Sequence, residues 1–173
     1  MGSLLKPPVG PGDHVIGHAD AAVEIVEYGD FQCPHCAAAH PVTKEILKVF
    51  GDQVRFVFRN FPLAESHRYA TIAAIAAEAA GLQHKYWEMH DMIFEHQASL
   101  SYDSLFVLAG KLGLNPEQFE RDLQNEALRD KVESDFESGI RSGVNGTPSF
   151  FVNGNKFDGA AGDLFAMLKE SSN

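Results

Sequence analysis

The chain has 173 residues, of which 45% are hydrophobic, so it can build the core of one domain and is not disordered. Acidic residues outnumber basic residues by 24 to 14, and the formal net charge of -10 argues against nucleic acid as a partner. No stretch reaches the roughly 18 to 20 apolar residues that a membrane span requires. The first residues lack the ordered regions of a signal peptide. Because Met1-Gly2-Ser3 could equally replace a removed signal, the compartment stays open.

The first predicted elements form a β-α-β unit. Residues 4–13, which contain several prolines and glycines, predict an extended tail or edge segment. Residues 23–28 predict a strand, and residues 37–50 predict a helix that ends at a glycine. Residues 54–59, in which Val54, Phe56 and Phe58 stand at alternate positions, predict a second strand. Two strands joined by one helix are expected to lie parallel, with a right-handed crossover.

The middle of the chain predicts only helices. In one of them, Tyr86, Trp87, His90, Ile93 and Phe94 recur at helical spacings, and this stripe is expected to be core rather than a ligand site. The predicted helices cover residues 66–80, 83–96, 102–112, 116–125 and 127–142.

The last third of the chain returns to strands. Residues 149–152 predict a strand, and Asn153-Gly154 is a strong two-residue hairpin turn. Residues 155–157 begin the return strand, and residues 162–169 predict a closing helix. The predicted order is therefore β-α-β, a block of helices, and β-β-α.

Both cysteines lie in one motif between the first predicted strand and its helix. Cys33 and Cys36 have the C-x-x-C spacing that can close a small disulfide ring. The N-terminus of a helix carries partial positive charge and free N–H groups, which favour a thiolate. A thiol with a lowered pKa both attacks and leaves well. Pro34 fits the first turn of a helix, where no N–H is needed. A redox-active pair is therefore the favoured interpretation.

Three other uses of the motif fit less well. A structural zinc site usually needs four ligands, and with no second cysteine pair His35 and His40 would have to complete it. Attachment of a c-type haem needs a histidine after the second cysteine, where this chain has Ala37. A purely structural disulfide more often links distant segments, because closing a long loop stabilises more. No metal ion and no separate cofactor are therefore predicted.

An acidic residue precedes the cysteine motif. Val23, Ile25 and Glu27 share one face of the first predicted strand, so Glu27 is an acid on an otherwise apolar face. Composition alone slightly favours an exposed acid near the end of the strand.

The order of the elements resembles the thioredoxin fold, and the block of helices before the final hairpin resembles the DsbA-like thiol-disulfide oxidoreductases. Three segments carry the resemblance, which extends over about residues 14–170: Glu27–Cys36, Tyr86–Asp91 and Gly143–Phe150. It implies an α/β, thioredoxin-like fold with an inserted all-helical subdomain. The implied division is an N-terminal extended segment at 1–20, a thioredoxin-like domain at 21–65 and 126–173, and a helical insertion at 66–125.

The resemblance also implies a role for each matching residue of the motif. Cys33 would be the exposed nucleophile, and Cys36 would be the buried resolving thiol. Pro34 and His35 would tune the pair, with His35 stabilising the Cys33 thiolate by charge or hydrogen bonding. Glu27 would be a buried acid that exchanges a proton with Cys36, which reverses the slight preference for an exposed acid.

A second group of residues is expected to bind the substrate. Pro148 would be the cis-proline that faces the disulfide, and Thr147 would offer its backbone to an extended substrate peptide. Phe31, in the active-site segment, is assigned to the same substrate-binding group. The most oxidising relatives with a Cys-Pro-His-Cys pair often carry valine before the cis-proline. Thr147 therefore leaves the direction of electron flow open.

The function predicted from the resemblance is oxidation of cysteine pairs in substrate proteins, outside the cytoplasm in the periplasm or a similar compartment. A membrane quinone-linked oxidase would re-oxidise the protein. The alternatives are a reductase or isomerase kept reduced by a thioredoxin-like donor, and a peptide-binding, chaperone-like module with incidental cysteines. A glutathione-transferase relative is disfavoured because that group typically lacks the cysteine pair. A cytoplasmic location is the alternative compartment.

Overall fold

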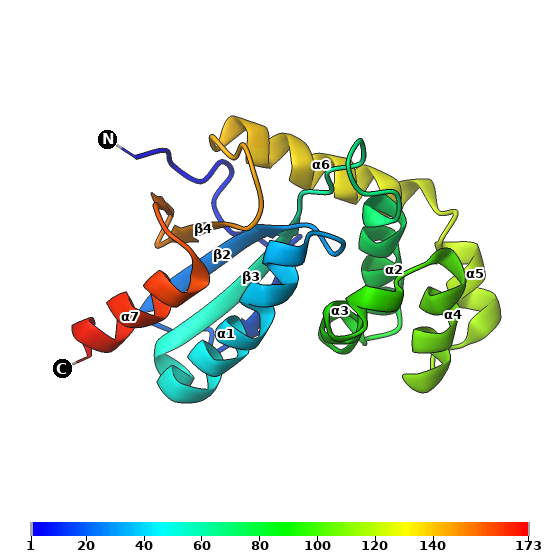
Figure 1. Ribbon diagram of the computed structural model, residues 1–173, viewed down its shortest axis with the longest axis horizontal. Helices are drawn as coiled ribbons and strands as arrows, with labels where there is room; N and C mark the ends of the chain where they lie inside the picture. The colour runs from blue at the N-terminus through cyan, green and yellow to red at the C-terminus, as the bar shows by residue number, and fades with distance from the viewer. Residues whose placement is uncertain (1, 173) are drawn as a thin grey trace.

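A mixed five-stranded sheet organises the computed structural model, which describes residues 2–172 (Figure 1). The strand order is β1-β3-β2-β4-β5, with β2 and β3 parallel and the other pairs antiparallel. The parallel pair and the helix between its strands confirm the predicted β-α-β unit. Met1 and Asn173, the outer ends of the predicted domain ranges, lie outside the described residues. The strands are β1 (His14–Gly17), β2 (Val23–Gly29), β3 (Val54–Asn60), β4 (Ser149–Val152) and β5 (Asn155–Phe157).

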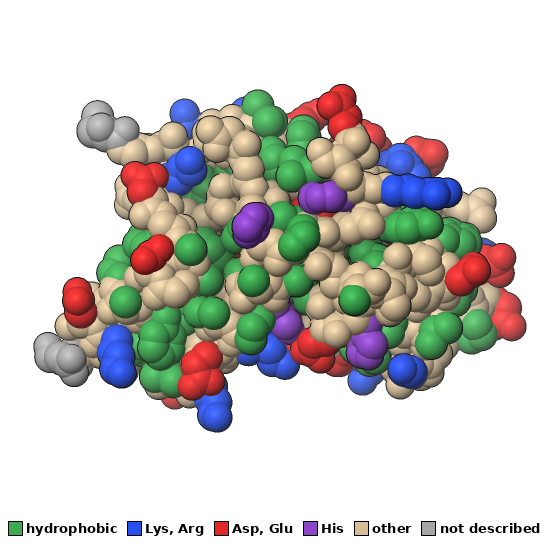
Figure 2. Space-filling view, viewed as in Figure 1, with side chains coloured by type: hydrophobic (Ala, Val, Ile, Leu, Met, Phe, Trp, Pro, Cys, Tyr) green, Lys and Arg blue, Asp and Glu red, His purple; other side chains and the backbone are tan. Residues whose placement is uncertain are grey.

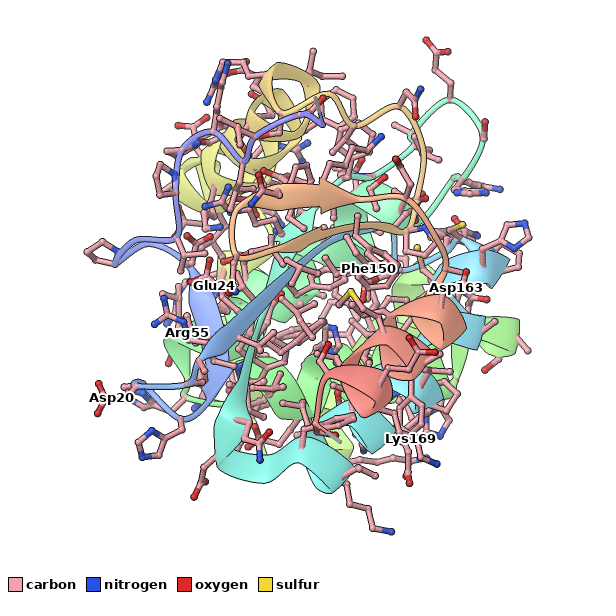
Figure 3. The ribbon with its side chains drawn as sticks, turned by 90° about the vertical axis from the view of Figure 1, so that its left-hand side faces the viewer. Asp20, Glu24, Arg55, Phe150, Asp163 and Lys169 are labelled. Carbon is pink, nitrogen blue, oxygen red and sulfur yellow. The ribbon has the colours of Figure 1, made fainter. Side chains whose placement is uncertain are left out.

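Helices cover both faces of the sheet. On one face, α1 (Pro34–Phe50) and α7 (Ala161–Ser171) lie side by side (Figure 1). Phe150 of β4 points to this face and belongs to the same buried cluster as Ile46 of α1 and Leu164 of α7 (Figure 3). The opposite face packs against α6 (Glu126–Arg141).

A block of helices lies between β3 and α6, as predicted. Its first helix begins at Ala70 rather than at residue 66, because Ser66 and His67 donate their N–H groups to Leu63 in a turn. The predicted stripe is core: Trp87 is half-buried, and the other members are buried. None of the described helices is long and apolar enough to cross a membrane. The helices of the block are α2 (Ala70–Leu82), α3 (Tyr86–Glu95), α4 (Tyr102–Lys111) and α5 (Pro116–Asp122).

The N-terminal segment is part of the sheet. Leu4 forms a bridge with Asn155 of β5, which confirms the predicted edge segment. Residues 14–17 then form β1, antiparallel to β3, and this strand was not predicted. Its four residues are too few to show an alternating pattern, and three of them are exposed at the sheet edge.

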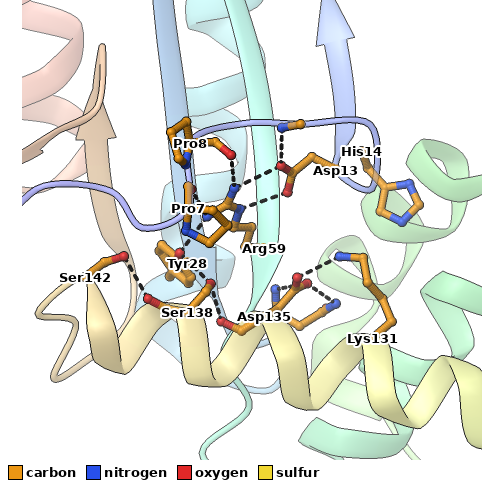
Figure 4. A network of polar contacts seen from close by, with 12 residues as sticks. Pro7, Pro8, Asp13, His14, Tyr28, Arg59, Lys131, Asp135, Ser138 and Ser142 are labelled. Carbon is orange, nitrogen blue, oxygen red and sulfur yellow. Dashed lines mark hydrogen bonds and ion pairs between the residues drawn. The ribbon is translucent and has the colours of Figure 1, made fainter.

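Arg59 of β3 ties this segment to the sheet (Figure 4). Its guanidinium donates to both carboxylate oxygens of Asp13, at 2.8 and 2.9 Å, and to the carbonyl oxygens of Pro7 and Pro8, at 3.0 and 3.3 Å. It also donates to the Tyr28 hydroxyl at 2.9 Å. Arg59 is only 2% exposed, so Asp13 balances a charge that water does not reach.

Candidate active site

Cys33 and Cys36 sit where β2 passes into α1. Cys33 is the N-cap of α1, and Pro34 occupies the first helical position, as the sequence predicts. The Cys33 carbonyl accepts the first helical hydrogen bonds, from the N–H groups of Cys36 and Ala37, both at 3.1 Å. Both cysteines are free thiols. Cys36 is 1% exposed, as expected for a shielded thiol. Cys33 is only 5% exposed, so the prediction of an exposed nucleophile is wrong, and its sulfur lies 3.7 Å from the Thr147 carbonyl oxygen.

The two thiols differ strongly in acidity. A hydrogen bond from the Cys36 thiol lowers the pKa of Cys33 to about 5 although burial opposes this, and the Thr147 side chain and the backbone N–H groups of Cys36 and His35 lower it further. The same hydrogen bond raises the pKa of Cys36, and burial and the nearby Glu27 carboxylate raise it further. At neutral pH the pair therefore holds one thiolate, on Cys33, and one thiol, on Cys36.

Glu27 lies on β2, on the face of the sheet that carries α1. It is 2% exposed, and its Oε2 atom has no hydrogen-bond partner among the described residues. Burial, together with the charge on Cys33, raises its pKa to about 8. Glu27 is therefore mostly protonated at neutral pH, close enough to Cys36 for its charge to raise the pKa of that thiol. A buried carboxyl in this state can give or take a proton at pH 7.

The loop before β4 faces the cysteines. The Thr147–Pro148 peptide bond is cis, and the Cys33 sulfur lies 3.7 Å from the Thr147 carbonyl oxygen, to which it donates only when protonated. Beside this contact an open groove of about 460 Å³ runs between α1 and the start of α7. Its lining is mostly small and apolar, and Figure 2 shows hydrophobic side chains gathered over α1 and α7.

Of two further assigned residues, His35 stabilises the Cys33 thiolate by hydrogen bonding, as predicted, and Phe31 does not lie where the prediction placed it. Phe31 is 1% exposed and packs its ring against Phe58 and Phe94, with centroids 5.0 and 4.9 Å apart. Its assignment to substrate binding is therefore wrong, because the ring belongs to the core. His35 is exposed and lines the groove, and its backbone N–H lowers the pKa of Cys33.

Comparison with known proteins decides the family. A family model described as thioredoxin matches residues 10–165. The chain belongs to the thioredoxin family. Within this family, BdbD from Bacillus subtilis superposes with a TM-score of 0.83 at 26% identity, over 99% of this chain and 96% of that one. The thiol-disulfide exchange protein alpha-DsbA2 from Wolbachia pipientis has the same fold, with a TM-score of 0.80 at 20% identity over 93% and 88% of the two chains. The predicted resemblance to DsbA-like proteins and the thioredoxin-like fold are confirmed.

Curated relatives of this thioredoxin-family chain are longer proteins. A protein named Na⁺/H⁺ antiporter NhaA 1 from Salinispora arenicola is 43% identical over 157 residues, which is 90% of this chain. The chain spans about a quarter of that relative's length, 24%.

Asp30, to which the sequence assigns no role, holds the loop that carries the cysteine motif. Asp30 is 1% exposed, and its carboxylate accepts from the Gln32 and Leu63 N–H groups at 2.7 and 3.0 Å. His67 Nδ1 lies 2.7 Å from the same carboxylate. Asp30 stands in the active-site segment, but no sequence pattern indicates that its carboxylate faces inward.

Among the described residues, one group of side chains has a spacing that could hold a metal ion. His40, His90 and Asp91 each offer a donor atom within 4.8 Å of the others. Each ring already pairs with a carboxylate: His40 with Glu95 at 3.0 Å, and His90 with Asp91 at 2.9 Å. Lys44 lies 3.4 Å from Asp91 and balances its charge. The cluster is a hydrogen-bonded network, and it does not include His35, which the sequence had offered as a zinc ligand with His40.

Glu27→Gln should slow thiol–disulfide exchange on the order of 10²-fold. This is the lower end of the range expected when a positioned proton donor is lost. The variant should also be more stable at alkaline pH. The raised pKa of Glu27 means that folding loses stability as pH rises from the ordinary value of 4.5 to about 8. Glutamine cannot ionise, so its advantage should be absent at pH 4 and complete above pH 8. Stopped-flow exchange rates and thermal unfolding measure the two effects.

Glu24→Gln is the matched control for this experiment. Glu24 lies on the same strand, three positions from Glu27 and so on the opposite face of the sheet, and forms a half-buried ion pair with Arg55 of β3 (Figure 3). Its variant should keep the wild-type exchange rate. If Glu27→Gln and Glu24→Gln behave alike in rate and pH dependence, Glu27 does not exchange a proton with Cys36.

Proposed function

We propose that this thiol-disulfide oxidoreductase oxidises cysteine pairs of substrate proteins, using Cys33 as its reactive sulfur. The observation that carries the proposal is the contrast between the two thiols, with the Cys33 pKa lowered to about 5 and the Cys36 pKa raised. A sulfur that is stable as a thiolate is a good leaving group, and stabilising the reduced pair makes its disulfide more oxidising.

The first step consumes the Cys33–Cys36 disulfide. A substrate thiolate attacks the Cys33 sulfur, a mixed disulfide forms, and the bond to Cys36 breaks. Cys36 leaves with the electron pair and needs a proton, because its pKa is raised by burial and by neighbouring charge. Glu27, protonated at neutral pH, is the group placed to supply that proton.

The second step releases the oxidised substrate. A second substrate thiolate attacks the substrate sulfur of the mixed disulfide, and Cys33 leaves as a thiolate. The hydrogen bond from Cys36 and the backbone N–H groups at the start of α1 stabilise that thiolate. The substrate gains a disulfide, and the enzyme holds the two electrons as a dithiol.

The groove beside Pro148 supports binding of an extended peptide. Its small apolar lining accepts an apolar substrate side chain, and the backbone of Thr147 lies next to the Cys33 sulfur. We assign substrate binding to Thr147, Pro148 and the exposed ring of His35, while Pro34 fixes the first turn of α1.

Thr147 favours a second candidate direction. It stands at the position where the most oxidising relatives often carry valine, and this difference in residue type favours a potential nearer that of a reductase or isomerase. Its contact with Cys33 acts in the opposite direction, because the Thr147 side chain lowers the pKa of Cys33. In the reductase direction, a thioredoxin-like donor would keep the pair reduced. The lowered pKa of Cys33 favours the oxidant, and this is the direction proposed here.

An oxidant of this kind works where disulfides persist, so we place the protein outside the cytoplasm, with a membrane quinone-linked oxidase as its electron acceptor. The longer relatives are named antiporters. We assign no ion transport to the thioredoxin-family unit.

The oxidised protein should convert a reduced dithiol peptide to its disulfide, with one peptide disulfide formed per protein disulfide consumed. Mass spectrometry of the peptide and thiol counting of the protein measure this exchange. A Cys33→Ser, Cys36→Ser double variant is the control and should be inactive. Catalysis of insulin reduction by a thioredoxin-type donor, without peptide oxidation, would favour the reductase. Binding of the peptide without either reaction would favour the peptide-binding module.

A further inference from the structure

The side chain of Gln97 joins the block of helices to the active-site loop. Gln97 begins a short 3-10 turn, Gln97–Ser99, that follows α3. Its side-chain nitrogen Nε2 donates to the carbonyl oxygen of Phe31 at 2.8 Å and to that of Cys33 at 2.9 Å. An amide NH₂ group has two hydrogens, so these two bonds use its full donor capacity.

The two carbonyls belong to the residues that set the position of the Cys33 sulfur. The donors of the same segment are held from the β2 side, since Gln32 N–H bonds the Asp30 carboxylate at 2.7 Å and Cys33 N–H bonds the Asp30 carbonyl at 3.1 Å. Gln97 holds the acceptors from the side of the helices. Asp30 therefore holds the N–H groups of the active-site loop, and Gln97 holds its carbonyl groups.

We propose that Gln97 is a positioning residue for thiol–disulfide exchange: by binding the Phe31 and Cys33 carbonyls, it holds the Cys33 sulfur in the place where it is stabilised as a thiolate. The inference rests on the proposed role of Cys33. It assigns to the helical block an indirect part in the chemistry, through one side chain that holds the active-site loop.

The stabilisation of the Cys33 thiolate depends on close geometry. The Cys36 thiol and the N–H groups of Cys36 and His35 must all reach the sulfur, and hydrogen bonds weaken steeply with distance and angle. Without Gln97, the Phe31 carbonyl loses a donor at 2.8 Å, and the loop can move away from that arrangement. Cys33 then becomes a weaker acid and a poorer leaving group.

Gln97→Met and Gln97→Glu test the proposal. Methionine keeps the length of the side chain without a donor, and we expect the pKa of Cys33 to rise by about half a unit, a roughly threefold effect on the thiolate. The equilibrium with glutathione should then shift about threefold toward the oxidised pair, or roughly 15 mV. Glutamate faces the two carbonyls with a negative charge, so its effect should be larger. Thiolate absorbance and glutathione titration give the two values.

Gln83→Met is the matched control. Gln83 also lies in the helical block, and its side-chain amide forms hydrogen bonds with the backbone N–H and carbonyl of Asn115. It should leave the Cys33 pKa and the glutathione equilibrium unchanged. A Gln97→Met protein that is folded and matches the wild type in both values overturns the proposal. If that variant does not fold, Gln97→Asn, which keeps the amide on a shorter side chain, decides by the same measurements. A wild-type Cys33 pKa near 9 would instead contradict the proposed function, and the relative glutathione equilibrium would still decide the role of Gln97.

Discussion

The reduced protein should melt at a higher temperature than the oxidised protein, by several degrees. In the reduced state the fold stabilises the Cys33 thiolate, because the pKa of Cys33 falls from 9.0 to about 5. The disulfide has no thiolate and loses this contribution. For a domain of this size, each 1 kcal/mol changes Tm by about 2–4 °C. Differential scanning calorimetry of the two redox forms at pH 7 measures the difference.

The advantage of the reduced form should depend on pH with a defined sign. A thiol whose pKa is lowered by folding contributes stability above its unfolded pKa and loses it as pH falls through its folded pKa. The difference in Tm should therefore be largest near pH 9, shrink as pH falls, and vanish below about pH 5. The same stabilisation should give a reduction potential above the roughly -270 mV of thioredoxin. An oxidised form that melts higher, with a potential at or below that value, would show that the protein is a reductase.

Replacing Cys36 with serine should stop turnover and leave one glutathione attached to Cys33. Oxidised glutathione reacts with the Cys33 thiolate, and the mixed disulfide persists because no resolving thiol remains. The matched variant Cys33→Ser should form the adduct at least about a hundredfold more slowly at pH 7, since the pKa of Cys36 is raised and its sulfur is buried. Intact-protein mass spectrometry over time measures both adducts. Equal rates in the two variants would contradict the assignment of Cys33 as the reactive sulfur.

The cysteine motif shows what short patterns can predict. Its place between a strand and a helix, and Pro34 at the first helical position, follow from local rules on strands, helix starts and proline. The same rules locate β2, β3 and the hairpin of β4 and β5. These rules do not locate strand β1. Its four residues at the sheet edge form a strand because they pair with β3, and they show no strand pattern of their own.

The surroundings of the motif were harder to predict, because they depend on contacts distant in sequence. Phe31 packs in the core against Phe58 and Phe94, and the Cys33 sulfur contacts the Thr147 carbonyl, 114 positions away. Gln97 lies 64 positions from Cys33, in a turn whose composition predicts only a loop. Glu27 is intermediate: its place on an apolar face is visible in the sequence, but the resemblance to a known family was needed to predict its burial.

The contact between Arg59 and Asp13 has a practical consequence for anyone who cuts this unit out of a longer polypeptide or grafts it into another. A domain boundary just before β1 would remove Asp13, Pro7 and Pro8. Arg59, which is 2% exposed, would then lose these hydrogen-bond partners and its counter-charge. Breaking a buried ion pair by removing one partner typically costs about 3–5 kcal/mol. A version of this unit for transfer into another protein therefore has to start before Pro7. It then keeps the N-terminal segment whose Asp13 neutralises the charge of Arg59.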